Sequence, residues 1–179
     1  MSAADGFRVR PAAAADVDQL VRLFVAVVDE GRWLGTEPPV DTAAQHDRFL
    51  HQIEEPVDSA SMVAASLDGD RVIGHAGVHL EPFKVAGLGM MVDAGWRGRG
   101  VGGALVEAAI AAARDLGAHK LALQAWPHND VAIRLYRRHG FVDEGLLRRH
   151  YRRRNGELWD AVIMGLVLDE ASPGSSLPA

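Results

Sequence analysis

Residues 97–103 read RGRGVGG, with four glycines and two arginines directly before a long apolar stretch. Glycine lets backbone N–H groups approach a ligand closely, and the first N–H groups of a helix favour anions. The segment therefore predicts a phosphate-binding loop that leads into a helix. Three kinds of phosphate loop have to be distinguished by the sequence that surrounds the glycines.

Two of these kinds are disfavoured by their neighbours. The dinucleotide pattern G-x-G-x-x-G is present, through Gly98, Gly100 and Gly103. However, the five residues DAGWR separate Gly98 from Val92, where the preceding strand should end, whereas a dinucleotide fold has its first glycine almost directly after the strand. The acid that such a fold needs about 20 residues later is also absent, because the next strand ends in QAW. A P-loop needs Lys followed by Ser or Thr, which does not occur here. The third kind fits: Arg97-x-x-Gly100-x-Gly102 between a strand and a helix.

Hydrophobic periodicity along the rest of the chain predicts helices around a sheet. The expected strands are near 7–12, 61–67, 71–80, 83–92, 120–126, 140–145 and 157–168, and the expected helices are 17–30, 41–54, 102–117 and 129–140. This order indicates a mixed α/β fold. On the helix after the glycine loop, we expect the buried side to be Leu105, Ala108, Ala112 and Leu116.

Composition limits the class of protein. The chain has 179 residues, 48% of them hydrophobic, which suits one domain over residues 1–170, followed by a disordered tail at 171–179. A net charge of −5 argues against a nucleic-acid partner. The chain has no cysteine, which excludes disulfides and thiolate metal sites, and no apolar run approaches the about 20 residues of a membrane-spanning helix. We therefore expect a soluble, cytoplasmic protein without a membrane partner.

Two motifs in a fixed order carry a resemblance to a known family. They are MMVDAGWRGRGVGGAL at 90–105 and NDVAIRLYRRHGF at 129–141. Residues 7–168 resemble the GNAT superfamily of acyl-CoA-dependent N-acetyltransferases, in which the first motif binds a pyrophosphate and the second is N-x-x-A-x-x-x-Y-x-x-x-G-F. The resemblance implies a mostly antiparallel sheet of about seven strands with helices on both faces. It also implies acetyl-CoA as co-substrate, with no metal.

The resemblance and the physical chemistry agree on where acetyl-CoA would bind. The backbone N–H groups of the glycine loop and the helix dipole suit its pyrophosphate, and the pantetheine arm suits the exposed backbone of a diverging strand. The expected contacts are Met90, Met91, Val92, Arg97, Gly98, Arg99, Gly100, Val101, Gly102, Gly103, Asn129 and Tyr136.

The chemistry needs an oxyanion donor, an acid and a base. The backbone N–H of Val92 is the candidate oxyanion donor, and Tyr136 is the candidate acid that protonates the leaving thiolate. For the base, many relatives have a glutamate where this chain has Gln124, and glutamine cannot act as a base.

A second candidate set for the base lies on the strand at 71–80. Period-two alternation places His75, His79 and Glu81 on one face, so a water chain to Glu81 or His79 is a plausible proton path. The same three residues are a weak metal candidate, because neighbours along one strand seldom close on one ion.

We expect transfer of an acetyl group to a primary amine of an amino acid or another small molecule, by direct attack in a ternary complex. Two alternatives stay open: acetylation of a protein N-terminus or lysine, and a non-catalytic acyl-CoA-binding sensor. The arginines between Arg148 and Arg154 are a candidate site for a carboxylate or for the 3′-phosphate of coenzyme A. A homodimer is also kept open, since dimers are common among such folds.

Overall fold

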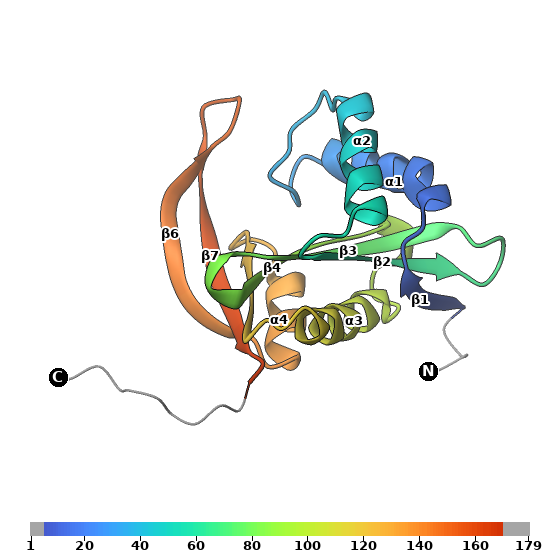
Figure 1. Ribbon diagram of the computed structural model, residues 1–179. Helices are drawn as coiled ribbons and strands as arrows, with labels where there is room; N and C mark the ends of the chain where they lie inside the picture. Colours follow the sequence, from blue (N-terminus) through green and yellow to red (C-terminus); the bar gives the residue numbers. More distant parts are fainter. Residues whose placement is uncertain (1–5, 170–179) are drawn as a thin grey trace.

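The computed structural model describes residues 6–169, which form one seven-stranded sheet with helices on both faces (Figure 1). The strands are β1 (Phe7–Pro11), β2 (Ser59–Ser66), β3 (Val72–Leu80), β4 (Val85–Val92), β5 (Lys120–Ala125), β6 (Val142–Arg152) and β7 (Leu158–Val167). The α-helices are α1 (Val17–Asp29), α2 (Thr42–Glu54), α3 (Val101–Asp115) and α4 (Asp130–Arg138). The predicted mixed fold is confirmed. The predicted disordered tail lies outside the described residues.

The sheet opens in its middle. The strand order is β1-β2-β3-β4-β5-β7-β6, and every neighbouring pair is antiparallel except β4 and β5. These two parallel strands are joined by three residue pairs only, from Val85 with Lys120 to Gly87 with Ala122. Beyond Gly87 the strands diverge, and the backbone of β4 loses its partner on that side.

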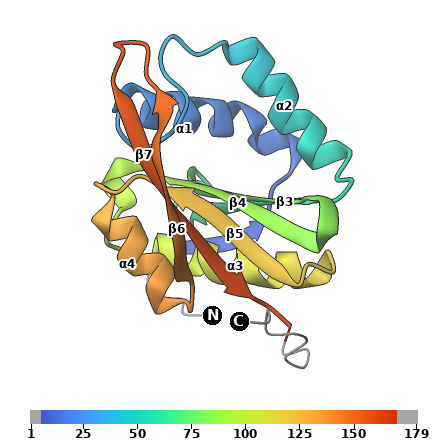
Figure 2. The same ribbon diagram turned by 90° about the vertical axis from the view of Figure 1, so that its left-hand side faces the viewer.

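Helices α1 and α2 cover one face of the sheet, and α3 and α4 cover the other (Figures 1 and 2). The β6–β7 hairpin extends past the sheet on the side of α1 and α2, and its tip lies near the loop that joins these helices. Among residues 6–169 no helix is long and apolar enough to cross a membrane.

The buried stripe of α3 differs from the prediction. The deepest residues are Val101, Leu105, Val106, Ala109 and Ala113, whereas Ala108, Ala112 and Leu116 are only partly buried at its flank. The reason lies in β3: a Cβ on Gly74 would be 2.9 Å from Leu105 and 3.1 Å from Val101. The missing side chain lets α3 approach the sheet along the line of these two residues.

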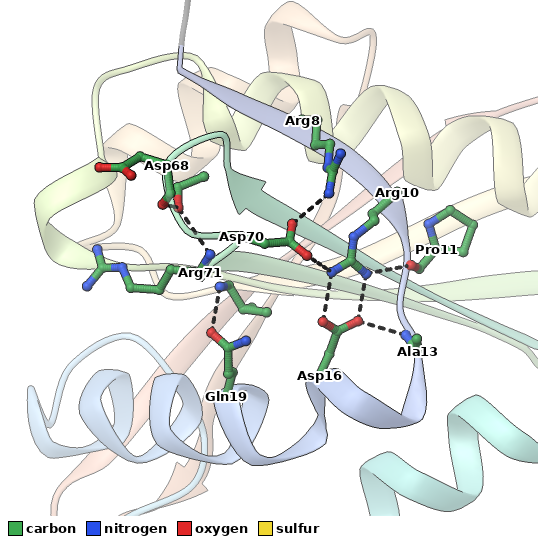
Figure 3. Close-up of polar contacts among 11 residues, drawn as sticks. Arg8, Arg10, Pro11, Ala13, Asp16, Gln19, Asp68, Asp70 and Arg71 are labelled. Carbon is green, nitrogen blue, oxygen red and sulfur yellow. Dashed lines mark hydrogen bonds and ion pairs between the residues drawn. The ribbon is translucent and has the colours of Figure 1, made fainter.

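A charged cluster fixes the start of α1 against the sheet (Figure 3). Arg10 on β1 donates two hydrogen bonds to Asp16, at 2.7 and 2.8 Å, and contacts Asp70 in the β2–β3 turn at 3.3 Å. The carboxylate of Asp16 is only 5% exposed and also accepts the N–H of Ala13. The hydrogen bond from Arg10 holds the pKa of Asp16 below its usual value.

Candidate active site

Two cavities meet at the opening between β4 and β5. The larger, of about 550 Å³, lies under α1 and α2, and the smaller, of about 210 Å³, extends toward α4. Both are lined by Leu34, by residues 88–90 of β4 and by Gln124 of β5. The two cavities therefore adjoin each other at the divergent part of the sheet.

The smaller cavity contains two of the predicted site residues, Asn129 and Tyr136. Asn129 is the N-cap of α4, and its Oδ1 accepts the N–H of Ala132 at 3.2 Å. Tyr136 is 7% exposed, and burial raises the pKa of its hydroxyl to about 12. This phenol is therefore protonated at all ordinary pH values and can act as a donor.

The glycine loop has the conformation that the sequence predicts. Gly98 and Gly100 have positive φ angles of 73° and 85°, and Gly100 is the N-cap of α3. Glycine offers no side chain to cap the helix, so the first N–H groups of α3 have no side-chain acceptor. Such a helix start suits an anion.

The two arginines of this loop have protein partners. Arg97 donates from Nε to the carbonyl of Val92 at 3.1 Å, and its two terminal nitrogens contact the carboxylate of Glu30 at 2.7 and 2.5 Å. This pairing lowers the pKa of Glu30. The guanidinium of Arg99 lies 5.2 Å from the ring centre of Trp96. Arg97 thus connects the loop to the end of α1.

The strand β4 places Met90, Met91 and Val92 at its open end. Met90 lines both cavities, and Met91 lines the larger one and is buried. Val92 lines neither cavity; it lies at the C-terminal end of β4, where Arg97 binds its carbonyl. Residues 88–90 are the part of β4 that lies at the junction.

The three candidates for the base all line the larger cavity, but their surroundings differ. His75 is buried against Phe49, and its Nε2 lies 2.9 Å from the hydroxyl of Ser61. Burial lowers the pKa of His75 to about 4, which makes it too weak a base to deprotonate an ammonium group.

His79 and Glu81 are exposed to the cavity. Glu81 follows β3 directly, and its Oε1 is 3.3 Å from the position that a Cβ on Gly87 would take. Its carboxylate therefore lies beside the last residue of β4 that pairs with β5, at the beginning of the opening. Among the described residues, no three His, Asp or Glu side chains are grouped so that they could hold a metal ion.

Sequence reasoning missed Tyr151. Its hydroxyl donates a 2.6 Å hydrogen bond to Oε1 of Gln124, and its ring packs against Trp126 with 5.0 Å between centres. Tyr151 lies within RRHYRRR, a stretch in which only the charges drew attention. The alternation of β6 was the available signal, but the strand was expected to end at residue 145 and instead extends to Arg152.

The predicted anion site on the arginine-rich segment is partly wrong, because two of its arginines are occupied. Arg153 is 6% exposed and donates to the carbonyls of Leu34 and Gly35, at 3.4 and 2.9 Å, while its Nε lies 3.4 Å from Glu37. Arg154 donates to the carbonyl of Pro38. These side chains hold the α1–α2 loop as a wall of both cavities.

Comparisons with known proteins agree with this geometry. The sequence profile described as "Acetyltransferase (GNAT) family" matches residues 23–141. L-amino acid N-acetyltransferase AaaT of Escherichia coli is 34% identical over 110 residues, which cover 59% of this chain and 67% of that protein.

Solved structures show the same fold. A GCN5-related N-acetyltransferase from Kribbella flavida superposes with a TM-score of 0.79 at 27% identity, over 91% of this chain and 98% of that one. A GNAT superfamily phosphinothricin acetyltransferase from Sinorhizobium meliloti, solved with acetyl-CoA, gives 0.81 at 21% identity, over 96% and 94%. The chain belongs to the acetyltransferase (GNAT) family and is an N-acetyltransferase.

Proposed function

We propose that the protein transfers the acetyl group of acetyl-CoA to the primary amine of a small molecule, with an amino acid or a related compound as the favoured class. The observation that carries this proposal is the meeting of two cavities at Leu88–Met90 and Gln124. A coenzyme arm in the smaller cavity and an amine in the larger one would meet there without a covalent enzyme intermediate. The name of the Escherichia coli relative supports the substrate class.

The residues present fit acetyl-CoA. In this proposal the loop from Arg97 to Gly103 binds the pyrophosphate through main-chain N–H groups. Gly98 and Gly100 have no side chains that would block the approach of the phosphates to the backbone. Asn129 and the open edge of β4 at Met90, Met91 and Val92 hold the pantetheine amides. Arg97 contributes through its backbone, since its guanidinium is occupied by Glu30.

The incoming amine must lose a proton before it attacks. Glu81 and His79 line the larger cavity beside the opening, so a water chain to one of them is the proposed path. The main chain of β4 supplies the proposed oxyanion donor, with the N–H of Val92 as the candidate that the resemblance indicates. Gln124 stands where many relatives have a glutamate base, but a glutamine side chain can only donate or accept hydrogen bonds.

Tyr136 is the proposed partner of the leaving sulfur. Because the pKa of Tyr136 is about 12 and that of a free thiol is about 8.5, complete proton transfer to the thiolate is unfavourable when taken alone. The phenol therefore stabilises the sulfur through a hydrogen bond as negative charge develops. If it gives its proton to the sulfur as the C–S bond breaks, the nitrogen of the adduct must return a proton to the phenol oxygen in the same step, so that the products are the amide, the thiol and an unchanged Tyr136.

The test has two parts. Acetyl-CoA, and not NAD, is expected to raise the melting temperature, since a ligand at 100 times its Kd adds about 2.7 kcal/mol to stability. Release of coenzyme A thiol is then followed with amino acids, polyamines, aminoglycosides and N-terminal peptides as acceptors. Turnover with peptides alone would favour a protein substrate, and protection without turnover would favour the acyl-CoA sensor.

Three further proposals accompany this function. The family domain covers residues 1–170, and the absence of cysteine from the sequence supports a cytoplasmic location. A homodimer is the proposed alternative to a monomer, and light scattering of the purified protein distinguishes the two.

A further inference from the structure

One side of α2 faces the larger cavity with polar groups that the reaction described above does not use. Gln45, Arg48, Phe49 and Gln52 all line this cavity, with spacings of three, four and seven residues from Gln45. These spacings place them on one face of the helix, above β2 and β3 (Figure 1). The wall is therefore a mixed surface, with amide and guanidinium groups around one aromatic ring.

The residue Gln45 is largely buried, and its side-chain amide is unpaired within the part of the chain that the structure describes. Its residue is 6% exposed, and no side-chain hydrogen bond involves it within residues 6–169. Every fully buried side-chain nitrogen and oxygen atom in that range has a partner, so the amide of Gln45 must open onto the cavity that it lines. The amide N–H groups of Gln45 are therefore available to a ligand that accepts hydrogen bonds in this cavity.

Arg48 lies one helical turn further along and is also without an acidic partner. No carboxylate within the described part of the chain lies within 4.0 Å of it, whereas Arg97 and Arg137 each pair with one and Arg10 pairs with two. Arg48 is the single Lys or Arg side chain in the lining of this cavity, and Glu81 is the single carboxylate. The cavity thus has one group of each charge, contributed by two different elements: α2 and the end of β3.

We infer that Gln45 and Arg48 bind the carboxylate of the acceptor, so that the protein selects amines that also carry a carboxylate, an amino acid being the simplest. A guanidinium and an amide N–H are the donors that a carboxylate prefers. Phe24, Leu34 and Phe49 line the same cavity and suit an apolar side chain. This inference rests on the proposed function and adds to it the residues that choose the substrate.

The experiment compares each acceptor with its primary amide, which keeps the amine and removes the negative charge. Wild-type protein is assayed for thiol release from acetyl-CoA with L-leucine, L-methionine, L-phenylalanine, β-alanine and γ-aminobutyrate, and with the corresponding amides. We expect at least one acid to exceed its amide at least tenfold in kcat/KM. In Arg48→Gln this ratio is expected to fall to near one, through a higher KM for the acid. Gln45→Leu is expected to lower the ratio in the same direction.

Arg22→Gln is the matched control, because Arg22 is an exposed helical arginine on α1 outside the cavity lining. It is expected to leave the ratio of acid to amide unchanged. Calorimetry with acetyl-CoA shows whether each variant is folded and binds the coenzyme. Equal use of acids and amides by the wild type, or an unchanged ratio in Arg48→Gln, overturns the inference while the acetyltransferase activity stands. No turnover with any amine overturns the proposed function itself.

Discussion

The hydroxyl of Tyr151 on β6 donates a 2.6 Å hydrogen bond to Oε1 of Gln124 on β5. This bond occupies the acceptor atom of the glutamine and leaves its amide N–H groups free. Since Gln124 lines both cavities, these N–H groups lie where amine and thioester are proposed to meet. A tyrosine from the edge strand thus determines which end of a neighbouring side chain is available to ligands.

Removing this bond is expected to lower turnover in a protein that remains folded. Tyr151→Phe keeps the ring that packs on Trp126 and loses one hydrogen bond worth about 1 kcal/mol, so kcat/KM should fall about fivefold. Steady-state kinetics measures the fall, and urea unfolding should show stability within about 1 kcal/mol of wild type. Val167→Ala on β7, an exposed side chain, serves as control. Unchanged kcat/KM in Tyr151→Phe would mean that the orientation of Gln124 is irrelevant to the reaction.

Tyr136→Phe is expected to lower kcat about 100-fold with little change in the Kd of acetyl-CoA, because the lost group acts on the leaving sulfur and not on binding. The ring remains packed against Phe141, 5.6 Å between centres, so folding should be retained. Single-turnover rates and calorimetry separate the two effects. Full activity in this variant would exclude Tyr136 from the mechanism.

Gly100→Ala is expected to lower both stability and affinity for acetyl-CoA. At φ 85° an alanine is strained by about 1–2 kcal/mol, and its methyl group lies on the proposed pyrophosphate loop. Gly117→Ala is the matched control: Gly117 has φ 74° and, like Gly100, no atom within 4 Å of an added Cβ, but it follows the other end of α3. Both variants should lose similar stability in thermal unfolding, and only Gly100→Ala should bind acetyl-CoA more weakly. Equal affinity in the two would contradict the assignment of the loop.

Acid sensitivity should depend on His75. The pKa of this group is about 4 when folded and near its usual 6.5 when unfolded, so the unfolded chain binds the proton more readily. The stabilisation is complete above pH 6.5 and is lost as the pH falls toward 4, by about 3 kcal/mol in all. Denaturant unfolding between pH 4 and 7 measures the slope. His75→Gln, which keeps a partner for Ser61, should flatten it, and a slope as steep as that of wild type would refute the assignment.

The sequence allowed prediction of the features that are local in the chain. The Arg97–Gly103 loop and the helix that begins with Asn129 each have their residue types within one short segment, and both lie where these patterns indicated. The alternation in β3 likewise placed His75 and His79 on one face correctly. It did not show that Phe49 of α2 covers His75 and leaves His79 open, because that depends on how a helix distant in sequence is seated.

Contacts between distant segments were beyond prediction. Arg97 pairs with Glu30, which is 67 residues away, and Arg153 binds the carbonyl of Gly35, which is 118 residues away. Hydrophobic periodicity carries no information on such pairs, so the sequence alone predicts these arginines as candidate anion ligands. The burial of α3 was misjudged for a related reason, since Gly74 on another element determines the line along which the helix packs.

The three residue pairs between β4 and β5 have a mechanical consequence. They make this the weakest seam of the sheet, because β5 is joined to β7 by six pairs and β3 to β4 by seven. An extended ligand bound between β4 and β5 would hold these two strands together. Amide hydrogen exchange should therefore slow in β4 and β5 when acetyl-CoA is added, and it should slow much less in β1 and β2. We therefore expect the sheet to gain rigidity when the coenzyme binds, and an unchanged exchange rate on β4 and β5 would contradict this.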